Sequence, residues 1–416
     1  MARSTLRRPT KRSPIEWAVR GFLAVTALTV GYASTKATLA FAVYRNSPER
    51  AFAFAPHNGR IAGALAEQIA ASDADARQRT WATYLARQAL EDEPLSTSAL
   101  TALALNTQIA GNTPAARKLF LHSNALSRRE LGTRLWLIED AVNRNDVNGA
   151  LHHYDVALRT AKASSDLLFP VLLNAISDPA IVRSLANTLA KRPPWGDAFI
   201  QYLSDKQSNP LVGAVLLQRL GALGYPVPGT AQASVINGLV AKGSYADAWR
   251  YYVSLHSGAT RNQSRDSNFT AQLQSPSAFD WTAMLNDSGI NASFQRTGRG
   301  GVFEFAAPST VGGVALQQVQ LLSPGHYRLE GVSMDIEQAR EAQPYWQLSC
   351  IDGRELGRVE IPNSAEMQGR FAGELTVQGA NCAAQTLRLV LRASSDVNGV
   401  TGQIKRVLLA PMGGKH

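Results

Sequence analysis

The chain has 416 residues, of which 45% are hydrophobic and 18% charged, and its formal net charge is +10. This length suits two or three domains, and the composition excludes a disordered chain. Residues 1–20 carry six basic side chains against one glutamate and so account for half of the net charge, which argues against nucleic-acid binding.

An apolar segment follows this basic head. Residues 21–44 read GFLAVTALTVGYASTKATLAFAVY, in which Lys36 is the one charged side chain. A basic head before such a segment predicts a transmembrane signal anchor in a bacterial inner membrane, crossing once, with the N-terminus in the cytoplasm and the bulk of the chain in the periplasm. A secretory signal peptide, cleaved near Ala33 or Ala40 to leave a periplasmic protein, is the alternative.

Residues 50–257 have a helical pattern, and alanines recur in it at a step of 34 residues. Ala82, Ala116 and Ala150 keep this step, and the pattern returns out of register at Ala248. An aromatic residue follows three of these alanines by four positions: Phe120, Tyr154 and Tyr252. An alanine lets two helices approach closely, and the aromatic ring fills the adjoining groove. Residues 165–225 predict helices that lack this pattern.

This fingerprint resembles the tetratricopeptide repeat, a helix–turn–helix unit that stacks into a solenoid. The resemblance implies a surface that holds partner proteins.

The composition changes near Ser257. Residues 258–277 are polar and predict a linker, whereas apolar and polar residues alternate in much of 278–412, which predicts strands. The expected strands are Val302–Phe305, Leu316–Leu321, Tyr327–Val332, Trp346–Cys350, Phe371–Val377, Leu387–Leu391 and Ile404–Leu409. Seven or eight short strands in this length predict an all-β sandwich of two sheets.

The pattern of this domain resembles the jelly-roll carbohydrate-binding modules. The resemblance is carried by Phe279-Asp280-Trp281, the glycine-rich Gly298–Gly301, the segment Leu321–Gly331 and the closing strand. It implies a jelly-roll fold and a glycan as the ligand. The whole chain is therefore expected to be multidomain α + β, with a transmembrane helix, an all-α solenoid and a β-sandwich.

Three aromatic residues are candidate stacking platforms for a sugar. Trp346 alternates with Leu348, which favours a core position for its ring. Tyr345 points to the opposite face of that strand and is the better platform. Trp281 follows the linker, where it either contacts a glycan or plugs the edge of the domain.

The chain has two cysteines, Cys350 and Cys382. In an exported domain such a pair predicts one disulfide, and two buried reduced thiols are the alternative. The sequence contains no Cys/His cluster of the kind that binds a structural zinc ion, which argues against such a site.

The sequence predicts no enzyme and no cofactor, because it has no nucleophile elbow, phosphate loop or zinc-protease motif. The carboxylates of Glu330, Asp335, Glu337 and Asp352 are available in the sandwich, but no motif pairs them. The combination of anchor, repeat and sandwich resembles accessory proteins of bacterial exopolysaccharide synthesis and export. It implies a non-enzymatic scaffold that binds other envelope proteins, and the alternative is a glycan-binding module presented by a helical stalk.

Overall fold

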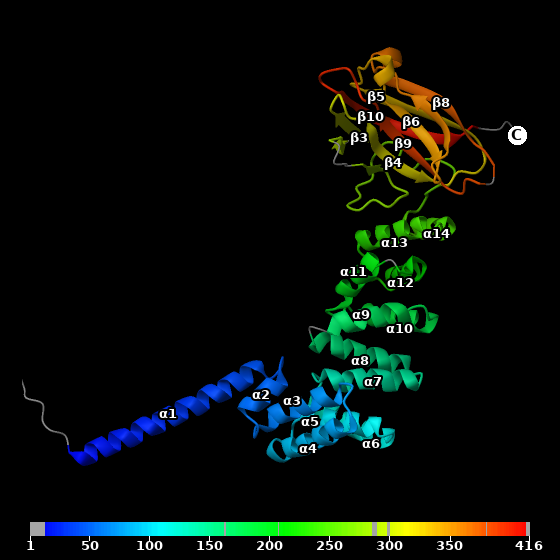
Figure 1. Cartoon of the computed structure of the whole chain (residues 1–416). Helices are drawn as coiled ribbons and strands as arrows, with labels where there is room; N and C mark the ends of the chain where they lie inside the picture. The colour runs from blue at the N-terminus through cyan, green and yellow to red at the C-terminus, as the bar shows by residue number, and fades with distance from the viewer. Residues whose placement is uncertain are drawn as a thin grey trace, which may run out of the picture. The chain divides into compact units, whose positions relative to one another are not determined.

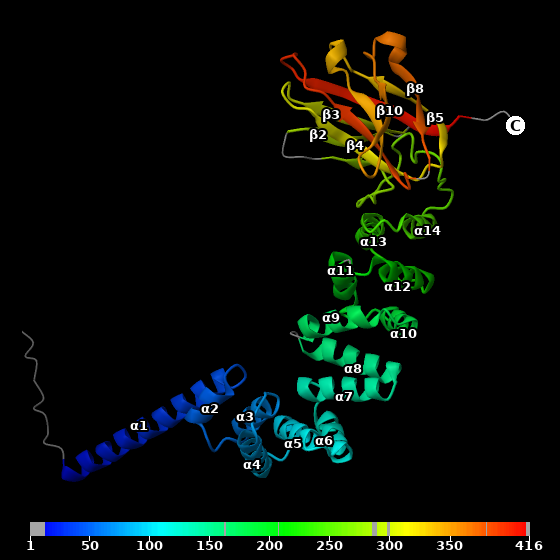
Figure 2. The ribbon, with the colours of Figure 1, turned by 45° about the vertical axis from the view of Figure 1, so that its right-hand side comes forward.

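The computed structural model describes residues 13–161, 164–206, 208–284, 289–297, 300–379 and 381–412. The described residues form fourteen α-helices followed by two antiparallel β-sheets, as the sequence predicts (Figures 1 and 2). The chain divides into two compact units, Met1–Leu168 and Phe169–His416. Most of the basic head lies outside the described residues.

The first helix, α1 (Pro14–Val43), runs through the predicted anchor and begins where Ser13 Oγ accepts the backbone N–H of Glu16. No helix in the described ranges, α1 included, is long and apolar enough to cross a membrane. The predicted single-pass location in the inner membrane is therefore wrong. The physical reason is that Arg20 and Lys36 leave about 22 Å of helix between them, less than the hydrocarbon core, and much of it is alanine, glycine and threonine.

The rest of the first unit is a run of helices in which each member contacts the next: α2 (Pro48–Phe54), α3 (Gly59–Ala70), α4 (Ala76–Asp92), α5 (Thr97–Ile109), α6 (Thr113–Leu126), α7 (Leu131–Asn143) and α8 (Val147–Thr160). The alanines of the 34-residue step lie at the helix contacts, with Ala82 and Ala116 at 0% and Ala150 at 6% exposed. Phe120 is buried and stacks on Trp136, and Tyr154 is buried too. Membership of the tetratricopeptide family stays a prediction.

Six further helices follow: α9 (Ser164–Ala175), α10 (Pro179–Leu189), α11 (Gly196–Lys206), α12 (Pro210–Ala222), α13 (Gly229–Ala241) and α14 (Tyr245–Leu255). Residues 165–225 are thus helical, and Pro179 and Pro210 stand in the first turns of α10 and α12, where a missing N–H costs nothing. Ala248 and Tyr252 of α14 are both buried.

The C-terminal part contains ten strands: β1 (Thr282–Ala283), β2 (Asn291–Thr297), β3 (Gly300–Ala307), β4 (Gly313–Gln320), β5 (Gly325–Met334), β6 (Tyr345–Cys350), β7 (Glu355–Glu360), β8 (Arg370–Val377), β9 (Gln385–Leu391) and β10 (Val400–Pro411). They form two five-stranded sheets, in the orders β1-β4-β9-β6-β7 and β2-β3-β10-β5-β8. All seven predicted strands are present. The prediction missed β1, β2 and β7, all of which lie at sheet edges.

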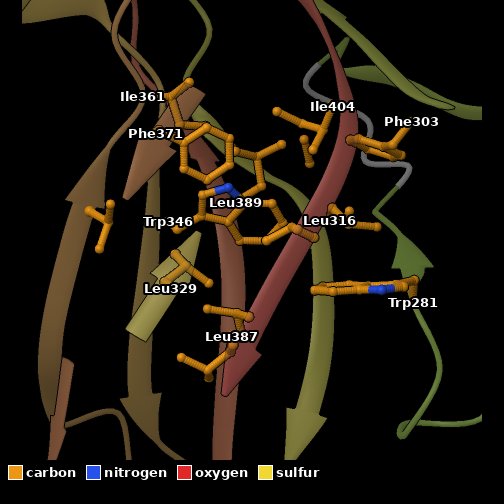
Figure 3. Packing of buried hydrophobic residues seen from close by; sticks show 14 of the residues in the cluster. Trp281, Phe303, Leu316, Leu329, Trp346, Ile361, Phe371, Leu387, Leu389 and Ile404 are labelled. Atoms are coloured by element: carbon orange, nitrogen blue, oxygen red, sulfur yellow. The ribbon is translucent and has the colours of Figure 1, made fainter. Parts of the chain in front are cut away.

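The two sheets enclose one apolar core, because side chains alternate between its inside and the solvent along each strand. Trp346 is fully buried there, and Figure 3 shows it among Leu389, Phe371 and Leu329. Trp281 packs in the same core, with its ring centroid 5.6 Å from that of Trp346.

Part of the predicted linker packs along the sandwich. β3 pairs with β10 only over Val400–Ile404. Beyond Ile404, the N–H of Ser264 donates to the Leu409 carbonyl, the N–H of Leu409 donates to Ser264 Oγ, and the N–H of Val407 donates to the Ser267 carbonyl. The segment therefore occupies the place beside β10 that β3 leaves open.

A buried charged cluster joins this segment to helix α14. Arg265 is 7% exposed, donates to the carbonyls of Phe279 (2.8 Å) and Val319, and lies over the Trp249 ring. Nearby, the buried Asp280 carboxylate accepts the Tyr252 hydroxyl at 2.7 Å. Burial lowers the pKa of Arg265 to about 10, so the guanidinium stays charged at neutral pH.

Candidate functional sites

The three aromatic residues considered as sugar-stacking platforms, Trp346, Trp281 and Tyr345, lie in different surroundings. Trp346 has no exposed surface, so its ring cannot meet a sugar. Trp281 is 5% exposed and borders a cavity of about 220 Å³ beside β1 and β2, which Ala271 and Leu273 help to line. This cavity is smaller than ordinary ligand pockets, which start at roughly 300 Å³.

Tyr345 does face outward from β6, but its ring is occupied. The guanidinium carbons of Arg392 and Arg358 lie 4.4 Å and 5.0 Å from the ring centroid, and the two arginines come from either side of β6 in the sheet. Each arginine is also held by a glutamate, Glu360 or Glu355. A sugar would have to displace these cation–π contacts before it could stack on the ring.

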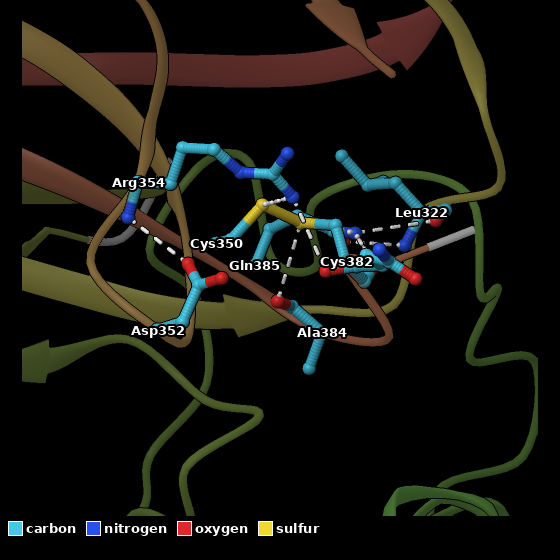
Figure 4. Close-up of a disulfide and its surroundings, with 8 residues drawn as sticks. Leu322, Cys350, Asp352, Arg354, Cys382, Ala384 and Gln385 are labelled. Carbon is cyan, nitrogen blue, oxygen red and sulfur yellow. Dashed lines mark hydrogen bonds between the residues drawn. A yellow bond between two sulfur atoms is a disulfide. The ribbon is translucent and has the colours of Figure 1, made fainter. Parts of the chain in front are cut away.

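Cys350 and Cys382 form the predicted disulfide at one end of the sandwich (Figure 4). Arg354 reaches over the Cys350 sulfur at 3.5 Å, and Gln385 donates to the Cys382 carbonyl at 2.7 Å. The bridge connects the end of β6 to the segment that enters β9, its neighbour in the sheet.

The outer face of the β2-β3-β10-β5-β8 sheet carries three hollows, of about 590, 520 and 320 Å³. We call the largest the arginine hollow; its lining includes Arg328, Glu330, Met367, Arg370, Ala372 and Arg406. The second is lined by Glu304, Asp335 and Gln403 among others, and Gln403 donates to Glu304 at 2.7 Å. The aromatic rings that border these hollows, Phe371 and Phe305, are buried.

Two of the carboxylates considered for catalysis thus lie in different hollows, Glu330 in the first and Asp335 in the second. Glu330 stands between two arginines, at 3.4 Å from Arg328 and 3.8 Å from Arg406. Asp352 lies elsewhere, in the turn between β6 and β7, where it accepts the N–H of Arg354.

The first unit has its own cleft, of about 1070 Å³, between the end of α1, α3, and the starts of α5 and α7. Glu67 and Glu130 line it, and Thr97 donates to Glu130 at 3.0 Å. Burial, followed by the charge of Glu130 and a hydrogen bond with it, raises the pKa of Glu67 well above its ordinary value of 4.5. The raised pKa favours the neutral form of Glu67, while Arg60 and Arg129 supply positive charge elsewhere in the lining.

Sequence reasoning missed both the arginine hollow and this cleft. The arginines of the hollow are scattered along the chain and meet only because β10, β5 and β8 are neighbours. Glu67 lies on α3 and Glu130 immediately before α7, and a period of 34 residues gives no sign that their carboxyl groups meet.

No protein-family model matches the chain, and no curated protein matches it. Among solved structures, the enzymatically active domain of tailspike protein 4 from bacteriophage CBA120 is similar over 35% of this chain, with 14% identity and a TM-score of 0.25. The match spans about a fifth (21%) of that tailspike chain.

The family 11 carbohydrate-binding module of the cellulosomal cellulase Lic26A-Cel5E from Clostridium thermocellum is similar over 38% of this chain and 100% of that one. Its identity is 9% and its TM-score 0.22. Likenesses this low assign no function to the chain.

Proposed function

We propose that this is a non-enzymatic binding protein whose β-sandwich holds a polysaccharide. The observation that carries the proposal is the row of hollows on the outer face of the β2-β3-β10-β5-β8 sheet. An extended sugar chain needs a sequence of concave places with hydrogen-bonding groups, and a rigid sheet presents such groups at fixed spacing. The hollows supply amide, carboxylate and guanidinium groups for that purpose.

A matched pair of glutamines tests this proposal in the full-length chain. Gln403 donates to Glu304 on the face with the hollows, and Gln347 donates to Glu355 on the outer face of the other sheet. We expect Gln403→Ala to weaken polysaccharide binding by about five- to tenfold, because one hydrogen-bonding group contributes about 1 kcal/mol. Gln347→Ala should leave it unchanged.

Binding is measured by affinity electrophoresis and calorimetry against a panel of bacterial and plant polysaccharides. Equal losses in both variants, or no binding to any polymer of the panel, would contradict the proposal.

The cleft of the first unit favours a second function, the binding of a partner protein. Its volume of about 1070 Å³ and its mixture of Glu67, Glu130, Arg60 and Arg129 suit an extended polypeptide with charged side chains. A chain that binds a polysaccharide through its sandwich and a partner protein through this cleft is a scaffold that assists polysaccharide synthesis or export.

A photo-crosslinking residue at Ser98, in the cleft, is expected to capture one defined protein in cells that make the chain. The same residue at Leu121, an exposed position of α6 outside the cleft, should capture none. Identical crosslinks from both positions would show that the cleft has no partner of its own.

A further inference from the structure

Three arginines meet on one side of the sandwich because three strands that are distant in sequence are neighbours in the sheet. In the register of the sheet, Arg406 of β10 and Arg370 of β8 lie opposite Val332 of β5, one on each side. Their backbones are therefore about 10 Å apart, two strand spacings. Arg328 projects from the same face of β5, four residues before Val332.

An irregularity in β10 contributes to this arrangement. The register with β5 shifts between Ile404 and Arg406, and both Lys405 and Arg406 are exposed at that point. A bulge of this kind places two successive side chains on the same face of a sheet, where they would otherwise alternate. The exposed Lys405 and Arg406 therefore add positive charge at the edge of the arginine hollow.

The hollow carries more positive than negative charge. Glu330 is shared by Arg328 and Arg406, at 3.4 and 3.8 Å, and these arginine side chains are 55% and 48% exposed. Glu360, also in the lining, is already held by Arg392 outside the hollow through two contacts of 2.7 and 2.9 Å.

Arg370 makes no ion pair within the described part of the chain. The cross-strand neighbour of Arg328 on β8, Glu374, lies outside the lining of the hollow. Glu330 thus pairs with two of the three guanidinium groups and leaves Arg370 without a carboxylate, which makes the hollow suited to an anion.

A strained turn places an apolar side chain beside these charges. Met367, Gln368 and Gly369 have successive φ angles of 48°, 58° and 71°, a left-handed conformation that is unfavourable for a non-glycine residue. The turn is held because Ser333 Oγ donates to the Gly369 carbonyl at 3.2 Å. Met367 is 76% exposed and contributes to the lining of the hollow. Its thioether offers an apolar contact where no aromatic platform is exposed.

We propose that the arginine hollow binds a carboxylate-bearing sugar, so that the polysaccharide held by the sandwich is acidic, a polymer of uronic acid residues. Arg370 and Arg406 bind the carboxylate as forked donors, and Met367 contacts the apolar C–H face of the ring. The inference rests on the proposed function and specifies its ligand.

The test uses the full-length chain and polygalacturonate, with the same polymer reduced at its carboxyl groups as the matched neutral ligand. We expect tighter binding to polygalacturonate, by at least about tenfold, since two charge-assisted contacts are lost on reduction. Arg370→Gln and Arg406→Gln should each lower the affinity by about tenfold and reduce its dependence on salt. Arg358→Gln, on the outer face of the other sheet, is the control. Circular dichroism and thermal unfolding establish that all variants fold.

Equal affinity for the two polymers would overturn the acidic ligand and leave polysaccharide binding intact. An equal loss in Arg358→Gln would also overturn it, because it would show that the basic chain attracts polyanions without a site. Binding to neither polymer, nor to any other polysaccharide, would instead remove the proposed function itself.

Discussion

Replacing Arg265 by alanine is expected to lower the free energy of unfolding of the second unit by about 3–5 kcal/mol, the usual effect of removing one partner from a buried charged network. The guanidinium is buried and donates to the main-chain carbonyls of Phe279 and Val319, so its removal leaves both carbonyls without this donor. Its removal also leaves Asp280 buried as a carboxylate with only neutral donors, among them the hydroxyl of Tyr252.

The measurement is urea unfolding of the full-length chain, followed by tryptophan fluorescence and by hydrogen exchange in β4 and β10. Arg250→Ala is the matched control, because Arg250 lies on the neighbouring helix α14, is 76% exposed and pairs with Asp247 of the same helix. It should change stability by less than about 1 kcal/mol. A similarly small effect of Arg265→Ala would show that the cluster does not stabilise the fold.

Removal of the disulfide is expected to cost the sandwich about 3–4 kcal/mol. Cys350 and Cys382 are 32 residues apart, and a bridge of this span restricts the unfolded chain by an amount of that order. The closed loop contains β7 and β8, an edge strand of each sheet, so the bridge limits the freedom of both.

The double variant Cys350→Ala, Cys382→Ala should unfold at lower temperature than the wild type, and a reducing agent should bring the wild type down to the level of the variant. The variant itself should not respond to the reductant. If wild type and variant unfold together under oxidising conditions, the bridge contributes nothing to stability.

The sandwich could be predicted from the sequence because the central strands have to bury every second side chain. Leu387, Leu389 and Leu391 in β9 show this alternation directly, and so does Trp346 with Leu348 in β6. Edge strands bury fewer side chains, so β2 and β7 give no clear alternation and were missed.

The anchor shows the opposite error. Residues 21–44 are rich in residues counted as apolar, but alanine, glycine and threonine contribute little to the hydropathy of a helix, and Lys36 interrupts the segment. The number of apolar residues therefore overestimated the hydropathy of α1 and its capacity to cross a membrane. A scale that weights each side chain by its transfer free energy would have exposed the difference.

The candidate site could not be predicted, since it depends on which strands become neighbours. Arg328, Arg370 and Arg406 carry no local signal, and nothing in their flanking residues links them. The same is true of Ser264, whose pairing with Leu409 brings a polar segment against the sandwich. Trp281 and Tyr345 looked suitable because aromatic residues bind sugars, but their surroundings are set by tertiary packing.

The order of strands has a consequence for how this chain is made. The twelve residues of β10 form the last strand in the described part of the chain and the central strand of their sheet, between β3 and β5. Until they emerge, the edges of β3 and β5 that they will occupy stay unpaired, and unpaired edges favour aggregation. The sheet with the arginine hollow therefore closes only once β10 has emerged, and a chain that stops before Val400 leaves two half-sheets without a centre.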